Sequence, residues 1–307
     1  MTIVFMGTPD FAVPSLKRLV AEGYTVAGVF TQPDRPKGRG NKLTKSPVKL
    51  AAEDFGIPVF QPERIRKDGV DMLRSLQPDL CVTAAFGQIL SQEVLDIPRL
   101  GNINVHASLL PKHRGSAPIA YAIMGGDQTT GVTTMMMDAG IDTGDILLQK
   151  ETEIREGETC AELTERLSMI GADLLIETLR SLEAGTLSRR KQNEAEMTYD
   201  PMLKKEMGLI RFDGSAESVC GLINGLNPWP SATVSIGNEQ MKLLRAVRAE
   251  AEGAPGTILT ANPREGLVIA CGTGAVRILE IQAPGGKRMK PEDYLRGHQI
   301  ETNTVIG

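Results

Sequence analysis

A strand, a glycine turn and a helix follow one another at the start of the chain, and this order constrains the fold more than any other feature. Residues 2–6 form a continuous apolar run, Gly7 to Asp10 form a turn, and apolar residues then recur at helical spacing over 11–20. A second apolar stretch over 25–30 completes a strand-helix-strand unit. Such units build parallel sheets with right-handed crossovers, and ligands bind at the carboxyl edge of the strands.

The alternation of helical and strand patterns continues to residue 182. Further helices are predicted over 47–55, 69–76, from Pro118 onward, and over 159–182 with Thr159 as N-cap. Further strands are predicted over 58–60, 80–84, a stretch ending at His106, 131–137 and 146–152. We therefore predict an α/β fold with a Rossmann-like parallel sheet over residues 1–188. The glycine spacing of dinucleotide and P-loop sites is absent, so neither NAD nor ATP is expected.

The rest of the chain has the pattern of a separate module. Residues 189–205 are polar and charged with few apolar residues, which is typical of a linker. After a short helix from Ala216, strands are predicted over 232–236, 241–247, 256–259, 267–270 and 276–281. This pattern predicts a small OB-like β-barrel domain over residues 206–307.

Composition is that of an ordinary globular protein. The 307 residues suffice for two domains, and no apolar run reaches the roughly 18 residues of a membrane-spanning helix. The first residues lack the pattern of a signal peptide. Four cysteines lie far apart in apolar surroundings, as in a protein of a reducing compartment. We expect a cytoplasmic protein without membrane contact, acting as a monomer.

Three polar residues are the candidates for chemistry. Asn104 and His106 are separated by two positions on a predicted strand, so both side chains project to the same face. Asp142 lies between Gly140 and Gly144 in a loop that can bring a carboxylate beside the imidazole. An amide that binds an oxyanion, an imidazole that transfers or stabilises a proton, and a carboxylate that orients it predict an acyl-transfer site.

Other chemistries fit the sequence less well. The three histidines have no zinc spacing, and residues 138–149 depart from the calcium-loop pattern, so we predict no metal. Ser116 is not in the glycine-flanked turn of a serine hydrolase.

Residues 32–49 form a basic segment. Between Thr31 and Leu50 the chain has six basic residues and one acid, a local charge of +5, although the whole chain has a net charge of −4. Its prolines and glycines predict a long exposed loop. Either the segment is a solvated excursion, or its lysines and arginines bind a phosphate backbone.

Five motifs together resemble the folate-dependent formyltransferases, and the resemblance runs essentially from end to end. They are Gly7-Thr8-Pro9-Asp10-Phe11, Asn104-Val105-His106-Ala107-Ser108-Leu109-Leu110-Pro111, Arg114-Gly115-Ser116-Ala117-Pro118, Gly140-Ile141-Asp142-Thr143-Gly144 and Asn227-Pro228-Trp229-Pro230. The insertion Gly38-Arg39-Gly40 and the second domain are more selective for the members that act on tRNA.

The resemblance implies an activity and two partners. A formyl group would pass from 10-formyltetrahydrofolate to the α-amino group of methionine on initiator tRNA, with Asn104, His106 and Asp142 as catalytic residues. The implied folate-binding residues are Ser108, Leu109, Leu110, Pro111, Phe86, Gly87, Gln88, Ile89 and Leu90. The candidate tRNA-binding residues are Lys37, Arg39, Lys42 and Lys45, with a further contribution from the barrel.

Two alternatives remain at this point. A formyltransferase acting on a small amine, such as an amino-sugar nucleotide or glycinamide ribonucleotide, would share the chemistry but would not need the basic segment. A nucleic-acid-binding protein on an inactive enzyme scaffold would not need an intact Asn104, His106 and Asp142.

Overall fold

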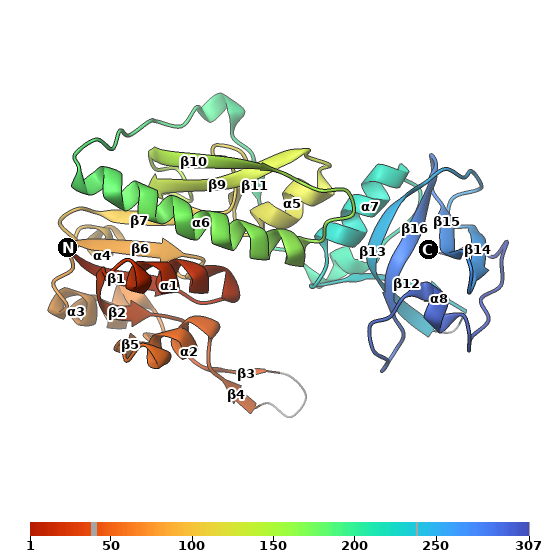
Figure 1. Ribbon diagram of the computed structural model, residues 1–307, viewed down its shortest axis with the longest axis horizontal. Coiled ribbons are helices and arrows are strands. Elements are labelled where there is room, and N and C mark those ends of the chain that lie inside the picture. Colours follow the sequence, from red (N-terminus) through yellow and green to blue (C-terminus); the bar gives the residue numbers. More distant parts are fainter. Residues whose placement is uncertain (38–41, 238, 307) are drawn as a thin grey trace. The chain divides into compact units, whose positions relative to one another are not determined.

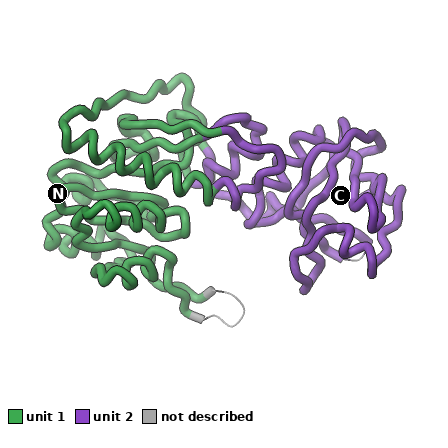
Figure 2. Tube along the Cα trace, viewed as in Figure 1, with its two compact units in different colours: residues 1–115, 131–152, 164–199 green, residues 116–130, 153–163, 200–307 purple. Residues whose placement is uncertain are grey.

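The computed structural model describes residues 1–37, 42–237 and 239–306, and its chain forms two compact units (Figure 2). The first unit comprises residues 1–115, 131–152 and 164–199. The second comprises residues 116–130, 153–163 and 200–307. The predicted division of the chain into residues 1–188, a linker over 189–205 and residues 206–307 stays a prediction.

A seven-stranded sheet forms the centre of the first unit, in the order β10-β9-β7-β6-β1-β2-β5 (Figure 1). Its strands are β1 (Thr2–Gly7), β2 (Thr25–Phe30), β5 (Val59–Phe60), β6 (Leu80–Ala84), β7 (Asn102–His106), β9 (Thr129–Met136) and β10 (Ile146–Glu153). The strands from β7 to β5 pair in parallel, and β9 pairs antiparallel with β7. The prediction of a parallel α/β sheet is confirmed. Parallel strands are covered on both faces, which is why residues 3–6 are a continuous apolar run without any exposed surface.

The two faces of β7 have different neighbours. Helix α6 (Cys160–Glu183) covers one face, where a Cβ on Gly171 would lie 2.8 Å from Val105. The side chains of Asn104 and His106 alternate with Val105 and therefore project from the other face. A buried cluster that includes Met6, Cys81, Phe86 and Leu90 packs on that side of the sheet. The polar side chains of β7 thus lie on the same side of the sheet as this apolar cluster.

Short helices complete the first unit. They are α1 (Val13–Ala21), α2 (Pro47–Asp54), α3 (Val70–Ser75) and α4 (Gln92–Leu95).

The predicted N-cap of α6 at Thr159 is confirmed, because its hydroxyl accepts a hydrogen bond from Glu162 N at 3.3 Å. The Glu162 carboxylate in turn accepts from Thr159 N at 2.9 Å, which completes a capping box.

The second unit contains a five-stranded antiparallel sheet in the order β12-β13-β16-β15-β14. The strands are β12 (Ala232–Ile236), β13 (Glu239–Ala249), β14 (Ile258–Asn262), β15 (Gly266–Ala270) and β16 (Ala275–Gln282), accompanied by α5 (Pro118–Met124), α7 (Ala216–Gly225) and α8 (Pro291–Tyr294). The sheet curls into a half-barrel around a buried apolar cluster. The prediction of an OB-like β domain is confirmed, in the form of a curled sheet whose edge strands are β12 and β14.

The prediction of a long loop from Gln32 to Pro47 is wrong in part, because strands β3 (Arg35–Lys37) and β4 (Lys42–Thr44) pair antiparallel within it. The predicted helix start at Pro47 is confirmed, since α2 begins there with Ser46 as its N-cap. The two strands pair only with each other, so they bury no sheet face and need no apolar alternation. A ribbon of this kind leaves no periodic signal in the sequence.

Among residues 1–37, 42–237 and 239–306, no helix combines the length and the apolar character needed to cross a bilayer.

Candidate active site

Strand β7 delivers two polar side chains to the carboxyl edge of the sheet. Asn104 is 8% exposed and His106 is 6% exposed, so both groups lie in a largely dry environment. Asn104 pairs with Thr83 of β6 on one side and with Met135 of β9 on the other. This central position holds the backbone of both residues in the sheet. The sequence prediction that they share one face agrees with the register of β7.

The loop after β9 brings Asp142 to the same place. Asp142 has a positive φ of 53°, which is uncommon for a residue other than glycine. A Cβ on Gly144 would collide with the carbonyl oxygen of Met136, so the loop can return to the sheet this closely only with glycine there. Thr143 Oγ1 donates to Asp138 Oδ1 at 2.6 Å and closes the turn.

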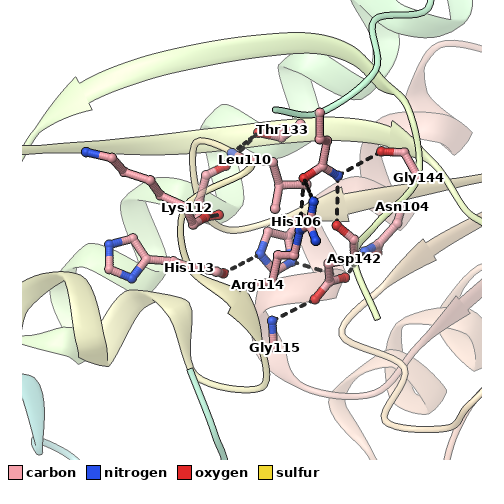
Figure 3. Close-up of polar contacts among 12 residues, drawn as sticks. Asn104, His106, Leu110, Lys112, His113, Arg114, Gly115, Thr133, Asp142 and Gly144 are labelled. Carbon is pink, nitrogen blue, oxygen red and sulfur yellow. Dashed lines mark hydrogen bonds and ion pairs between the residues drawn. The ribbon is translucent and has the colours of Figure 1, made fainter. Parts of the chain in front are cut away.

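Two of the three predicted catalytic residues, Asn104 and His106, face the same carboxylate oxygen of the third, Asp142 (Figure 3). Asp142 Oδ1 lies 3.6 Å from His106 Nδ1 and 3.5 Å from Asn104 Nδ2. Asp142 Oδ2 instead accepts a hydrogen bond from Gly115 N at 2.8 Å. The carboxylate is therefore anchored through one oxygen and faces the amide and the imidazole with the other.

The backbone fixes the other nitrogen of His106. Nε2 lies 2.9 Å from the carbonyl oxygen of His113. A carbonyl oxygen only accepts hydrogen bonds, so Nε2 carries a proton. Nδ1 is then the position at which the ring takes up or releases a second proton, and it faces Asp142. The site combines a hydrogen-bond donor, a proton carrier and a negative charge.

A pocket of about 150 Å³ opens beside this group. It is lined by Gln88, Ile89, Leu90, Met135, Met137, Asp138, Ala139, Gly140, Ile141 and Asp142. Three of the residues expected to bind folate, those at 88–90, therefore share a pocket with a catalytic candidate. The side chain of Gln88 points elsewhere, since it bonds Ile65 N at 2.6 Å and Pro62 O at 3.0 Å. Gln88 can therefore contact a ligand in this pocket through its backbone.

The other expected folate-binding residues are not in the lining of this pocket. Phe86 is buried in the apolar cluster, and the carbonyl of Gly87 accepts from Gln32 Nε2 at 3.0 Å. Ser108 is fully buried, and its hydroxyl donates to Lys112 O at 2.7 Å. Leu110 packs with Met135, which does line the pocket. For all nine of these residues, at 86–90 and 108–111, the folate-binding role stays a prediction.

Sequence reasoning missed two residues that support the site. Thr133, fully buried and opposite His106 in the β7–β9 register, donates to Ser108 O at 2.6 Å and accepts from Leu110 N at 3.1 Å. Gln192 lies in the predicted linker, yet its amide bonds the Asp142 loop. Register across the sheet identifies Thr133 once the strands are paired. No sequence pattern marks Gln192.

The candidate tRNA-binding residues are only partly described. Arg39 lies outside the described residues, and Lys37 and Lys42 are placed as backbone of β3 and β4. Lys45 forms an ion pair with Glu53 at 2.8 Å, with both side chains well exposed. Solvent screens exposed pairs of this kind, so a phosphate can compete for the lysine.

Within the part of the chain that the structure describes, no group of three or more His, Cys, Asp and Glu side chains is arranged to hold a metal ion.

An α/β sheet with an amide, an imidazole and a carboxylate at its carboxyl edge defines an acyl-transfer enzyme. The chain belongs to the formyl transferase family: the model of the formyl transferase domain matches residues 1–179, and that of the formyl transferase C-terminal domain matches residues 202–299. The family predicted from the sequence motifs is thus confirmed.

Relatives and solved structures agree with this assignment. The chain is 47% identical over 308 residues to the methionyl-tRNA formyltransferase of Geobacter metallireducens, covering 100% of this chain and 99% of that one. It is 49% identical over 311 residues to that of Acetivibrio thermocellus, covering both chains fully.

Two solved structures share the fold at low sequence identity. The sugar 3N-formyl transferase WlaRD, solved with dTDP and 5-N-formyl-THF, has a TM-score of 0.68 and 20% identity, covering 92% of this chain and 97% of that one. HypX from Aquifex aeolicus, solved with tetrahydrofolic acid, has a TM-score of 0.67 and 16% identity, covering 99% of this chain and 50% of that one.

Proposed function

We propose that this chain transfers the formyl group of 10-formyltetrahydrofolate to the α-amino group of methionine on initiator methionyl-tRNA. The observation that carries the proposal is the convergence of Asn104 and His106 on Asp142 beside a pocket. The chain is also matched over its full length by relatives named methionyl-tRNA formyltransferase, second unit included. The sugar formyl transferases that share the fold are far less similar in sequence.

Asn104 supplies the oxyanion contact. When an amine adds to a formyl carbon, negative charge develops on the formyl oxygen, and a donor aimed at that oxygen stabilises the transition state. Asn104 Nδ2 is held only at the long distance of 3.5 Å from Asp142 Oδ1, which leaves its N–H groups able to turn toward a substrate oxygen. Removing one such donor typically costs about 100-fold to 1,000-fold in rate.

His106 and Asp142 carry out the proton transfer from the attacking amine to the leaving nitrogen. The attacking amine must lose a proton as the new C–N bond forms, and the leaving nitrogen of the folate must gain one. His106 Nδ1 accepts and returns that proton, because Nε2 is committed to the carbonyl of His113. Asp142 stabilises the doubly protonated ring across 3.6 Å, in surroundings that water hardly reaches.

The pocket beside Asp142 fits one ring system of the folate. Its volume of about 150 Å³ lies below the roughly 300–1,000 Å³ of sites that enclose a whole drug-sized ligand. Residues 88–90 and 138–141 line it, and backbone N–H and C=O groups of lining residues can bond the polar edge of a pterin. The folate supplies the activated formyl group, and this chain's residues hold it against Asn104 and His106.

The remaining proposals concern the partners and the setting. We assign tRNA contacts to the basic segment and to the second unit, because six basic residues in residues 31–50 match a phosphate backbone. None of the four cysteines forms a disulfide, which supports a reducing compartment such as the cytoplasm. We also propose that the protein acts as a monomer.

Mass spectrometry of the product tests the function. Methionyl-tRNA is incubated with the protein and 10-formyltetrahydrofolate, and the aminoacyl group is then released and weighed. A gain of one formyl group on methionine is expected. Free methionine and a small amino sugar serve as competing amines. Formylation of the amino sugar without formylation of methionyl-tRNA would refute the proposal.

A further inference from the structure

Residues 190–199 form a segment of the first unit that is hydrogen-bonded to two parts of the chain around the active site. Arg190 and Ile146 exchange two backbone hydrogen bonds of 2.8 and 2.9 Å. Farther along, Thr198 accepts from Arg114 N at 2.9 Å through its carbonyl, and its hydroxyl accepts from His113 N at 2.7 Å. The segment is therefore fastened both to the strand after the Asp142 loop and to the turn that contacts His106.

Between these two points, Gln192 holds the Asp142 loop directly. Its Nε2 donates to the carbonyl oxygen of Asp142 at 2.7 Å and to that of Gly144 at 2.8 Å. A side-chain amide has two N–H donors, and both are used here. One side chain thus clamps two backbone positions, one of which is the catalytic aspartate itself.

Arg114 determines which way the Gln192 amide points. Its Nε and Nη2 donate to Gln192 Oε1 at 3.0 and 2.9 Å. A guanidinium only donates, so the amide oxygen must face it and the amide nitrogen must face the loop. Arg114 is 3% exposed and is itself held by Glu194, at 2.7 and 3.0 Å. The same contact lowers the pKa of the Glu194 carboxyl below its usual value.

The Asp142 loop needs such support. The positive φ of Asp142 is unfavourable for a residue other than glycine, and it persists only where the surroundings enforce it. The loop also lines the pocket, so its position determines where Asp142 Oδ1 lies relative to Asn104 and His106. A displacement of about 1 Å in an active site can reduce a rate by about 100-fold.

We propose that Gln192, oriented by Arg114, is a positioning residue that fixes Asp142 for catalysis. The inference rests on the proposed formyl transfer. Gln192 contacts no reacting group, so its effect passes through the segments it holds, above all the Asp142 loop. This predicts that its contribution disappears when Asp142 can no longer act.

A double-mutant cycle with Asp142→Asn tests this dependence. Gln192→Ala is expected to reduce kcat about 10-fold in the wild-type background and less than about 2-fold in the Asp142→Asn background. Gln192→Glu keeps the size of the side chain and its acceptors but has no N–H donor, so it should lose as much kcat as Gln192→Ala. Asn193→Ala is the matched control, because among the described residues that amide bonds Ala195 N and Glu196, both within its own segment. Equal losses in both backgrounds, or a Gln192→Glu variant with wild-type kcat, would overturn the inference.

Hydrogen exchange gives a readout that needs no activity. Amides of residues 138–146 should exchange faster in Gln192→Ala and Gln192→Glu than in wild type or Asn193→Ala. Unchanged exchange in both Gln192 variants would refute the positioning role. A wild-type protein that does not formylate methionyl-tRNA, but whose loop loosens in these variants, would instead refute the proposed function and leave the clamp established.

Discussion

Gly115 N donates to Asp142 Oδ2 at 2.8 Å, while the other carboxylate oxygen faces Asn104 Nδ2 and His106 Nδ1. The two oxygens of one side chain thus have separate tasks. The first fixes the carboxylate to the backbone after Arg114, and the second faces the amide of Asn104 and the ring of His106. Because the same turn also accepts the Nε2 proton of His106 through His113 O, one short stretch of chain orients both Asp142 and His106.

Replacement of His106 tests the chemical step. His106→Ala should reduce kcat by about 100-fold or more, since general acid–base catalysis contributes about 100-fold to 10,000-fold. Steady-state kinetics with methionyl-tRNA and the folate provide the measurement. His298→Ala is the control, because His298 stacks on Tyr294 in the second unit, and it should leave kcat unchanged. A His106→Ala enzyme with a higher KM and normal kcat would contradict the catalytic assignment.

Two asparagines on β7 should respond differently to the same substitution. Asn104→Ala should reduce kcat by about 100-fold to 1,000-fold through loss of the oxyanion donor, with folate affinity largely retained. Asn102→Ala should leave kcat nearly unchanged but lower the free energy of unfolding by about 1–3 kcal/mol, because buried Asn102 Nδ2 donates to Leu95 O at 2.8 Å.

Kinetics, equilibrium dialysis with the folate and urea unfolding separate the two effects. Complete loss of folate binding in Asn104→Ala would show that this amide holds the ground state, contrary to the assignment. A large loss of kcat in Asn102→Ala without a loss of stability would contradict the assignment of a structural role to Asn102 and a catalytic role to Asn104.

The sequence pattern was sufficient for the parts of the site that depend on regular geometry. The period of two along β7 places Asn104 and His106 on one face in any sheet register, and the glycines around Asp142 permit close approach. Alternation of strands and helices predicts the parallel sheet, because its buried strands must be apolar on both faces. These features follow from local rules.

The features that sequence reasoning missed depend on long-range or unpatterned contacts. Gln192 bonds backbone carbonyls 48 and 50 residues away, and a carbonyl leaves no mark of its partner in the sequence. The β3–β4 ribbon buries no face, so it lacks the alternation that identifies a strand. The pocket beside Asp142 arises from two loops whose approach is set by tertiary packing.

The cysteines should be mostly unreactive in the folded protein. Burial raises the pKa of Cys220 to about 12 and that of Cys271 to about 11, and it also raises the pKa of buried Cys81. The thiolate is the reactive form, so at pH 8 only the partly exposed Cys160 should react quickly with a thiol reagent. Counting fast-reacting thiols before and after unfolding provides the measurement, and one against four is expected.

The same pKa shifts predict how stability changes with pH. Unfolded thiols ionise above about pH 8.5, whereas the buried ones stay protonated in the native state. The native state then binds more protons, so the free energy of unfolding should fall as pH rises from about 8.5 to 11. Replacing Cys220 and Cys271 with Ala should flatten this decline. Two or more fast thiols in the folded protein, or an unchanged decline, would contradict the prediction.

The basic segment offers a test of how tRNA is bound. Changing Arg39, Lys42 and Lys45 together to Ala should raise KM for methionyl-tRNA and leave folate binding unchanged. Lysine and arginine displace counterions from phosphates, so each lost contact should reduce the slope of log affinity against log salt by roughly 0.7 to 0.9. Filter binding at several salt concentrations measures the slope. Lys49 is left in place because it bonds Asp34 at 2.7 Å, is only 14% exposed and supports the local fold.

A matched variant separates this local effect from the change in net charge. Lys17, Lys67 and Lys150 are exposed lysines elsewhere in the first unit, and changing them to Ala removes the same three charges. Long-range attraction is screened beyond about 10 Å at 0.1 M salt, so these lysines should affect binding only weakly. If both triple variants reduced the salt slope equally, general attraction would account for tRNA binding. If neither changed KM or the slope, the segment over residues 32–49 would be a solvated excursion, and recognition of the tRNA would rest on the second unit.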